Sequence, residues 1–315
     1  MSEWPALRTD SWTGCRETLH LFTQVVGKVV LEQTPLISHW WNVGFSLTDR
    51  GMETELIHHE GHTYQLGFDF QDHIFFVERD DDVRRGIDLE GVTVADFYQD
   101  VLETLAQIGL KTTIWPMPVE IAGAIPFDQD TDHQAYTPAS VVTFWETLLK
   151  ISAVYQQYRA DFMGKASPTL FWWGSFDLST SRFSGRMAPP NTHPAPNCGP
   201  QVMLEAYSRE LQNIGFWPDY GSEGAFFQYF YPEPEGFRDA DLGEGVFWDK
   251  DLGEFILPYE VARTSPDPAA KILEFMNKGY AAGSTLGNWD NATLMRHWNP
   301  ETEPVSADPA LEKRS

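Results

Sequence analysis

Two stretches, SHWWNVGFSL (38–47) and TLFWWGSFDL (169–178), share one arrangement. Each contains a pair of tryptophans that is followed within a few residues by a phenylalanine and then by a leucine. The segments around the two pairs also follow one order: a helix, a Gly-Lys step, a Ser/Thr-Pro step, the tryptophan pair and a strand. This order indicates an internal duplication, in which Trp40–Trp41 and Trp172–Trp173 occupy equivalent places.

The first half contains patterns typical of a helix, an antiparallel sheet and a second helix. Apolar residues at helical spacing predict a helix over residues 14–33, which Pro35 ends. Short alternating segments over residues 40–89, separated by turn compositions, predict an antiparallel meander. An amphipathic helix over residues 93–108 and a short strand over residues 111–115 complete this unit.

The second half repeats that order with different spacings. A long helix is predicted over residues 138–163, because Thr137 is a suitable N-cap and proline is favoured at the first helical position. The second tryptophan pair follows on a strand, and residues 186–201 form an insertion. A closing strand and an amphipathic helix that starts at an Asp-Pro step are predicted within residues 253–283.

The predicted fold class is therefore α+β, with two similar units of helix, antiparallel sheet and helix related by an internal pseudo-twofold duplication. The predicted boundaries are residues 1–118 for the first unit, 119–137 for a linker, 138–285 for the second unit, and 286–315 for a C-terminal helix or turn and a flexible tail. A cleft between such units is a common place for a small-molecule site.

Composition excludes several classes of protein. The 315 residues include 22 basic and 46 acidic side chains, for a net charge of −24, which disfavours nucleic acid and anionic membrane surfaces as partners. No apolar run has the length of a membrane span, and the start of the chain lacks the pattern of a signal peptide, so a cytoplasmic location is expected. The two cysteines, Cys15 and Cys198, form neither a disulfide framework nor a zinc motif.

Several motifs resemble those of an uncharacterised bacterial family that is catalogued only as a domain of unknown function. The resemblance covers nearly the whole chain and implies no reaction, substrate or cofactor. The motifs that carry it are WPALRTDSWTGCRETLHLFTQVVGK (4–28), HWWNVGFSLTDRG (39–51), FDFQDH (68–73), IWPMPVEI (114–121), IPFDQD (125–130), GSFDLSTSRFSGR (174–186) and GEFILPY (253–259).

The motif GSFDLSTSRFSGR contains the strongest candidates for chemistry. In an extended strand, Ser175, Asp177 and the next two alternate serines share one side. A turn after them would bring Arg182 or Arg186 back beside Asp177, so we expect a buried carboxylate that hydrogen bonds to one of these arginines. Such an arginine could receive a carboxylate or phosphate of a ligand. Alternatively, the pair only stabilises a hairpin.

Two further residues are candidates for moving protons. His39 precedes the first tryptophan pair, and an aromatic setting suits either a general base or a core histidine with a satisfied hydrogen bond. Glu120 lies in an apolar context, where burial would raise the pKa of its carboxyl group. It could instead link the two halves by bonding to backbone amides. Trp40, Trp41, Trp172 and Trp173 are expected to form the apolar walls of the same site.

No metal and no cofactor are predicted. His58, His59 and His62 are close in sequence, but the flanking alternation places them in a hairpin where neighbours point to opposite faces. Zinc, nucleotide-binding and hydrolase motifs are missing from the sequence. The candidate metal ligands that remain are His39, His73, Glu120 and His133.

We therefore expect an enzyme or a specific binder of a small polar or anionic molecule, with its site at the junction of the halves. In this hypothesis Asp177, His39 and Glu120 have catalytic roles, and the arginines, the tryptophans and Ser175 bind the ligand. One alternative is a non-catalytic interaction protein with an acidic surface, and another is a carbohydrate binder. A polar pocket beside the tryptophans would favour the first hypothesis, and a dry junction would favour the interaction protein.

Overall fold

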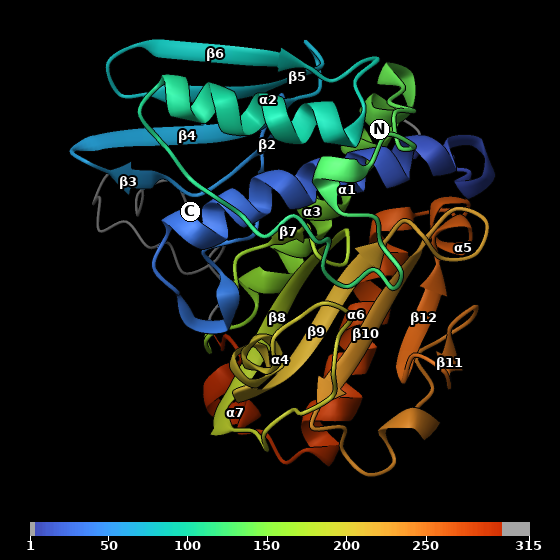
Figure 1. The fold of residues 1–315 in the computed structure, drawn as a ribbon. Helices are drawn as coiled ribbons and strands as arrows, with labels where there is room; N and C mark the ends of the chain where they lie inside the picture. The colour runs from blue at the N-terminus through green and yellow to red at the C-terminus, as the bar shows by residue number, and fades with distance from the viewer. Residues whose placement is uncertain (1–3, 298–315) are drawn as a thin grey trace, which may run out of the picture.

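The structure is a computed structural model that describes residues 4–297. Within this range the chain forms seven α-helices and two six-stranded antiparallel sheets, which confirms the predicted α+β class (Figure 1). None of the helices in this range combines the length and the hydropathy needed to cross a bilayer. The shorter elements outside the sheets are α4 (Pro200–Ala206), α5 (Tyr259–Arg263), α7 (Asn291–Leu294), and the 3₁₀ turns η1 (Ser38–Trp40), η2 (Phe127–Gln129) and η3 (Phe237–Asp239).

The first sheet is the meander that the sequence predicts. Its order is β1-β2-β4-β5-β6, and β3 pairs with β4 through the register His59↔His62, so the histidines do lie in a hairpin. Alternate residues of the central strands β4 and β5 join the hydrophobic core, namely Tyr64, Leu66, Phe68, Phe75 and Val77. The strands are β1 (Ser46–Leu47), β2 (Gly51–Glu53), β3 (Ile57–His59), β4 (His62–Asp69), β5 (Ile74–Arg79) and β6 (Val83–Asp88).

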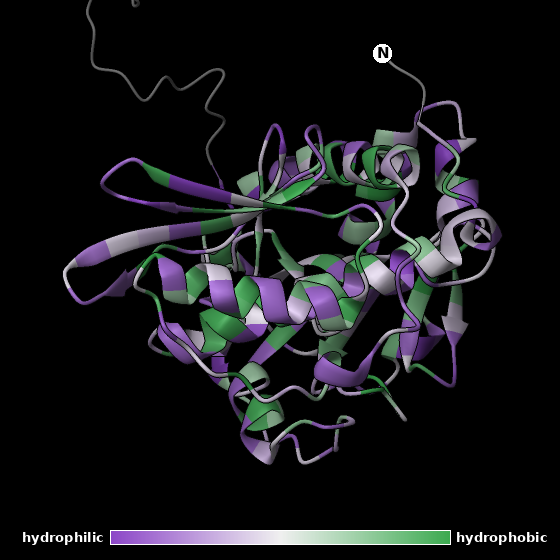
Figure 2. Ribbon diagram, turned by 45° about the horizontal axis from the view of Figure 1, so that its top comes forward, coloured by the Kyte–Doolittle hydropathy of each residue, from purple (hydrophilic) through white to green (hydrophobic). Residues whose placement is uncertain are grey.

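Two of the predicted helices pack with the first sheet. Helix α1 (Thr9–Gln33) starts five residues earlier than predicted and runs between the two sheets (Figure 1). Helix α2 (Val94–Gln107) has Thr93 as its N-cap, whose hydroxyl accepts from the Asp96 amide at 3.0 Å. Figure 2 shows hydrophobic and hydrophilic positions on the same helices, as expected where one side faces the core.

The second sheet has the order β11-β12-β10-β9-β8-β7. Helices α3 (Pro138–Ala160) and α6 (Pro268–Leu286) contact one of its faces, and Asp267 caps α6 by accepting from the Ala270 amide at 3.1 Å. The other face is therefore left for loops and α1. The strands are β7 (Leu170–Trp172), β8 (Asp177–Met187), β9 (Arg209–Trp217), β10 (Ala225–Tyr231), β11 (Phe247–Asp249) and β12 (Glu254–Pro258).

A hydrophobic core continues from one sheet to the other. Trp173 is a central residue of this junction: its indole N–H donates to the Val43 carbonyl at 2.9 Å, and its ring lies against Gly27 of α1. A Cβ atom at Gly27 would lie 2.3 Å from the Trp173 ring, so only glycine permits this approach. The tryptophan pairs thus join the two halves.

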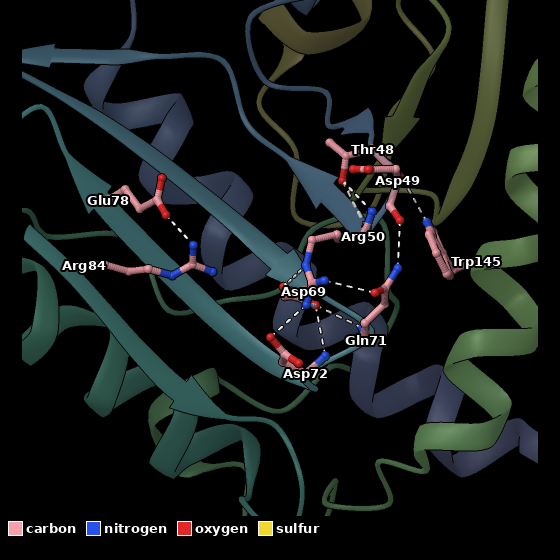
Figure 3. Close-up of polar contacts among 10 residues, drawn as sticks. Thr48, Asp49, Arg50, Asp69, Gln71, Asp72, Glu78, Arg84 and Trp145 are labelled. Atoms are coloured by element: carbon pink, nitrogen blue, oxygen red, sulfur yellow. Dashed lines mark hydrogen bonds and ion pairs between the residues drawn. The ribbon is translucent and has the colours of Figure 1, made fainter. Parts of the chain in front are cut away.

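An arginine-centred network stabilises the end of the first sheet (Figure 3). Arg50 contacts both carboxylate oxygens of the buried Asp69, at 2.6 and 3.1 Å, and contacts Asp72 at 2.7 Å. The Trp145 indole of α3 donates to the Thr48 carbonyl at 3.1 Å, which ties this end to the second half. The network is a structural ion-pair cluster, because its groups satisfy one another.

Three expectations from the sequence are corrected or left open. Residues 111–115 form no strand, because this segment leads into Pro116 and Pro118 and finds no sheet edge to pair with. Trp40 lies in the η1 turn, whereas Trp172 ends a strand, so the pairs differ in local structure and the internal duplication is not confirmed. The domain boundaries stay a prediction, and the tail from Asn299 onward lies outside the described residues.

Candidate functional site

A cavity of about 990 Å³ lies against the face of the second sheet that α3 and α6 leave uncovered. Helix α1, residues 115–122 and helix α4 provide its other walls. Eight of the ten side chains predicted for the site line this one cavity, whereas Arg182 and Arg186 do not. The eight are His39, Trp40, Trp41, Glu120, Trp172, Trp173, Ser175 and Asp177.

The alternation of side chains along β8 decides which of its residues form the floor of the cavity. Asp177, Ser179 and Ser181 of β8 point to the cavity, and Leu178 between them points into the core. The register Ser181↔Asn213 extends this face to β9, where the Asn213 amide donates to the Ser181 hydroxyl at 2.9 Å. The floor therefore has a polar strip beside the apolar side chains of Leu211 and Phe227, while tryptophans form much of the walls.

Asp177 is the most enclosed acid of the cavity. Its side chain is 6% exposed, and the Ser175 hydroxyl donates to one of its carboxylate oxygens. Burial raises the pKa of the Asp177 carboxyl group to about 6, although hydrogen bonds from Ser175 and Ser179 oppose the shift. The predicted burial of Asp177 is thus confirmed.

The predicted arginine partners of Asp177 are wrong. Strand β8 continues without a turn from Asp177 to Met187, and Arg182 lies an odd number of residues from Asp177, so it points to the opposite face. Arg182 is 1% exposed, and its guanidinium lies 3.5 Å from the centre of the Tyr158 ring and donates to the Tyr158 carbonyl. This cation–π contact is structural.

Arg186 also has a structural place, near the end of β8. Its side chain contacts the Glu210 carboxylate at 2.6 Å and donates to the carbonyls of Gly287 and Asn288 at 2.6 and 3.0 Å. These contacts tie β8 to the residues that follow α6. Neither arginine is available to bind an anion in the cavity.

Glu120 contributes a second acid from the loop after Pro118. Its carboxylate lies against Gly174, where a Cβ atom would come within 2.2 Å of its Oε1 atom. Burial and the nearby Asp177 raise the pKa of Glu120 to about 7. The Glu120 side chain is exposed where it lines the cavity, so it is less enclosed than Asp177. Its carboxyl group accepts no backbone amide in the described chain, contrary to the alternative role as a link.

Glu254, which the sequence analysis missed, supplies the third acid. It begins β12 and lines the cavity, and burial together with the nearby Asp177 raises its pKa to about 8. Tyr229 and Tyr207 lie near it and share a hydroxyl–hydroxyl hydrogen bond of 2.8 Å. The sequence signal was a lone acid at the start of the apolar strand EFILP.

Helix α1 adds two basic groups that were also missed. The imidazole Nε2 of His20 lies 3.0 Å from the Gly174 carbonyl, and burial lowers the pKa of His20 to about 4, so the ring is neutral at neutral pH. Lys28 lies 5.0 Å from the centre of the Trp115 ring, and burial lowers its pKa to about 8. Their spacing of eight residues puts both on one side of the helix.

Backbone strain is concentrated around the cavity. Nine non-glycine residues of the described chain have positive φ, and five of them line the cavity. A left-handed conformation costs a bulky L-residue about 1–2 kcal/mol, so such residues persist where the surrounding structure holds them and gather at functional sites. The five, with φ from 55° to 63°, are His39, Trp40, Glu120, Phe176 and Asn197.

Residues 188–207 cross one side of the cavity and end in α4. The His39 amide donates to the Glu205 carboxylate at 2.9 Å, and the His39 Nδ1 atom lies 2.9 Å from the Ala206 carbonyl. The Trp40 indole donates to the Val202 carbonyl at 3.0 Å. Thus the strained η1 turn holds α4 in place, and the predicted insertion forms part of the site wall.

The residues that the sequence suggested as possible metal ligands do not lie together. In the described chain, one group of three ligand atoms lies within 4.8 Å, and it consists of His62, Asp80 and Asp81 at the surface. None of the named candidates belongs to it: His73 contacts the Tyr136 hydroxyl at 3.1 Å and His133 contacts Asp130 at 2.8 Å. The cavity acids do not form such a group either.

The acids of the cavity have the chemistry for proton exchange near neutral pH. A carboxyl group with a pKa of 6 to 8 holds a proton in part at neutral pH, so it can donate or accept one. The aromatic walls can enclose an apolar part of a ligand.

Comparison with known proteins identifies a family whose function is unknown. No curated protein matches the chain, and no solved structure does. A family profile matches residues 4–296, nearly the whole of the described chain, in agreement with the resemblance of the motifs. The chain belongs to DUF5996, a family of unknown function.

Proposed function

We propose that the protein binds a small polar molecule that is not anionic, in the cavity between α1 and the second sheet. The supporting observation is that Asp177, Glu120 and Glu254 come from three separate elements to one cavity with aromatic walls. The expectation of an anionic ligand depended on Arg182 and Arg186, which lie elsewhere. A cavity with an uncompensated set of acids disfavours an anion.

Acid–base chemistry on the ligand is the catalytic form of this proposal. Asp177 and Glu254 would contact the polar part of the ligand, Glu120 would exchange a proton with it, and Trp172 would contact its apolar part. His39 keeps its predicted place in this proposal as a candidate base, because its Nδ1 atom donates to the Ala206 carbonyl and its Nε2 atom is then the basic nitrogen of the ring. The same bond positions the wall.

A carbohydrate is the second candidate ligand. Indole faces stack on sugar rings, and carboxylates, amides and hydroxyls bind sugar hydroxyl groups. The polar floor formed by Ser181 and Asn213, beside Trp41 and Trp172, supports this alternative. An interaction protein with a dry junction is disfavoured by a cavity of this volume.

The test is a ligand screen with a blocked cavity as its control. Fragments grouped as cationic, neutral and anionic are added to the protein, and the melting temperature is measured, because a ligand of the native state raises it. Ser175→Trp fills the cavity from an exposed position, and Ser222→Trp adds the same side chain on an exposed turn that does not line the cavity. We expect neutral or cationic fragments to stabilise the wild type and Ser222→Trp but not Ser175→Trp. Preferential stabilisation by anions, or an equal response of both variants, would contradict the proposal.

A further inference from the structure

We propose that the ligand carries a positively charged organic group, a primary amine or a quaternary ammonium, which lies among Asp177, Glu254 and Glu120. This inference rests on the proposed function and specifies the class of its ligand. It follows from the charges of the cavity, from the aromatic surfaces beside the acids, and from the places of the basic residues.

The three acids have no cationic partner within residues 4–297. No ion pair joins Asp177, Glu120 or Glu254 to a lysine, arginine or histidine in this range. Burial is the main influence on each acid, and the charge of Asp177 adds to it at Glu120 and Glu254. Asp177 is buried, Glu254 is half-buried and Glu120 is exposed where it lines the cavity. A buried carboxylate without a cationic partner is costly, so proteins usually pair it, and this cost is greatest at Asp177. A cation supplied by the ligand would be such a partner for Asp177 and would also attract the other two acids.

The basic residues at the cavity contact groups other than the three acids. Arg16 contacts the Asp219 carboxylate at 2.8 Å, and Lys28 lies over the Trp115 ring. Lys165 lies 4.9 Å from the centre of the Trp41 ring, which shows that an indole of this wall already accepts a cation on one face. The wall therefore favours a cation by two means, because carboxylates and aromatic faces both attract positive charge.

Proton release distinguishes this ligand from a neutral one. A bound cation stabilises the charged carboxylates and lowers their pKa values, so binding releases protons and becomes tighter as the pH rises from 6 to 8. A neutral ligand lacks this strong coupling. The other titratable groups that line the cavity are Arg16, Glu17, His20, Lys28 and Glu32 on α1, His39 in η1, Cys198, Tyr207, Asp219 and Tyr229, and Tyr155 of α3 lies behind Asp177.

Among these groups, Lys28 has a charge change that must be separated from those of the acids. Lys28 loses its proton near pH 8, which would also favour a cation at high pH. The variant Lys28→Met removes this contribution and leaves the three acids in place. His20 is already neutral over the range from pH 6 to 8.

The experiment uses matched ligands that differ only in their polar group. Benzyl, indolylmethyl and cyclohexylmethyl bodies are each prepared with a trimethylammonium, a primary ammonium, a hydroxyl and a carboxylate group. Calorimetry at pH 6 and pH 8 in two buffers of different ionisation enthalpy gives both the affinity and the number of protons released. We expect ammonium compounds to bind about ten-fold tighter than the matching alcohols at pH 8, with proton release and a smaller advantage at pH 6.

Variants assign the effect to the acids. Asp177→Asn and Glu254→Gln should each weaken ammonium binding about five-fold or more and change alcohol binding less than about two-fold. Glu103→Gln removes one negative charge from an exposed helical position outside the cavity and should change neither. Melting curves of each variant show that the fold is retained. Lys28→Met should keep the tightening between pH 6 and pH 8.

The outcomes separate this inference from the proposed function. Equal binding of ammonium compounds and alcohols, abolished by Ser175→Trp, would overturn the cationic ligand and leave the proposed function standing. Binding of sugars but not of ammonium compounds would do the same and would favour the carbohydrate alternative. Tighter binding of carboxylates, or no binding of any compound of the series and of any sugar tested beside it, would overturn both.

Discussion

Phe45 and Phe171 exchange a pair of backbone hydrogen bonds, with N···O distances of 2.9 and 2.8 Å, and so join the two tryptophan-bearing stretches. The core residues of both sheets form a continuous cluster across this contact. We therefore expect residues 4–297 to unfold in one cooperative transition, although the chain contains two sheets. Differential scanning calorimetry checks this through the ratio of the calorimetric to the van't Hoff enthalpy, which should be close to one.

Two transitions in the calorimeter, or a fragment of residues 1–137 that folds by itself, would contradict this expectation. Tryptophan fluorescence and far-ultraviolet circular dichroism should also give the same midpoint. Such agreement is the usual sign that no partly folded species is populated.

Gly27 and Trp173 give a second prediction. Gly27→Ala places a Cβ atom 2.3 Å from a ring that the Val43 carbonyl holds in place, so we expect a loss of about 2–3 kcal/mol in the free energy of unfolding. The better helix propensity of alanine offsets about 1 kcal/mol at most. Urea unfolding measures the change.

Trp173→Phe provides the matched background for this test. The smaller ring lacks the Nε1 atom, which would lie 2.3 Å from the added Cβ atom, so Gly27→Ala should cost less in that background. Equal costs in both backgrounds would show that the steric contact with Trp173 is not the cause.

Elements set by local sequence were predictable. The helical spacing of apolar residues predicted α1, α2, α3 and α6. The capping residues Thr93 and Asp267 occupy the predicted places. Alternation along GSFDLSTS correctly put Asp177 and the serines on one face. Such features depend on neighbours a few residues apart, which a single sequence displays.

Features set by tertiary structure were not predictable. Nothing local shows that β8 continues to Met187, so the sequence allowed a turn that would have paired Asp177 with an arginine. Trp40 adopts a left-handed conformation that is rare for a bulky residue, so its stretch resembled a strand. Glu254 and His20 meet the cavity from distant elements, and their convergence requires the packed fold.

Asp177 and Asp69 are both buried, but replacing each by asparagine should change the stability of the protein in opposite directions. Asp177 has no cationic partner and a raised pKa, so its contribution to stability is complete below about pH 4 and is lost as the pH rises through 6. Asp177→Asn keeps an acceptor for Ser175 and should stabilise the protein at pH 8 by on the order of 1 kcal/mol, with little effect at pH 4.

Asp69 is paired with Arg50 in the network that Figure 3 shows. This interaction helps to lower the pKa of Asp69. Asp69→Asn should therefore destabilise the protein at pH 8 by on the order of 2–3 kcal/mol. Urea unfolding at the two pH values measures both changes. A loss of stability for Asp177→Asn as large as that for Asp69→Asn would show that Asp177 has a charged partner after all.

Glu254 should make the unliganded protein less stable at alkaline pH. Its pKa is about 8 in the folded protein and close to its ordinary value of 4.5 when unfolded, so the folded state holds the extra proton between these values. Stability from this group is present below pH 4.5 and falls as the pH rises through 8. Glu254→Gln should flatten this part of the stability profile and add on the order of 2 kcal/mol at pH 8.5. An unchanged profile would contradict the raised pKa.

The contact between η1 and α4 gives the last prediction. Glu205 accepts from the His39 amide at 2.9 Å, and His39 and Trp40 keep their left-handed backbone partly through this bond. Glu205→Ala removes the acceptor, so α4 should separate more often from the cavity wall, and its amides should exchange with deuterium about ten-fold faster. Glu205→Gln keeps an oxygen at the same place and should exchange nearly as slowly as the wild type. Because α4 contains seven residues and buries none of them fully, the change should be confined to residues 188–207 and η1. Hydrogen exchange with mass spectrometry resolves these segments, and faster exchange throughout the second sheet would mean that Glu205 supports the fold as a whole.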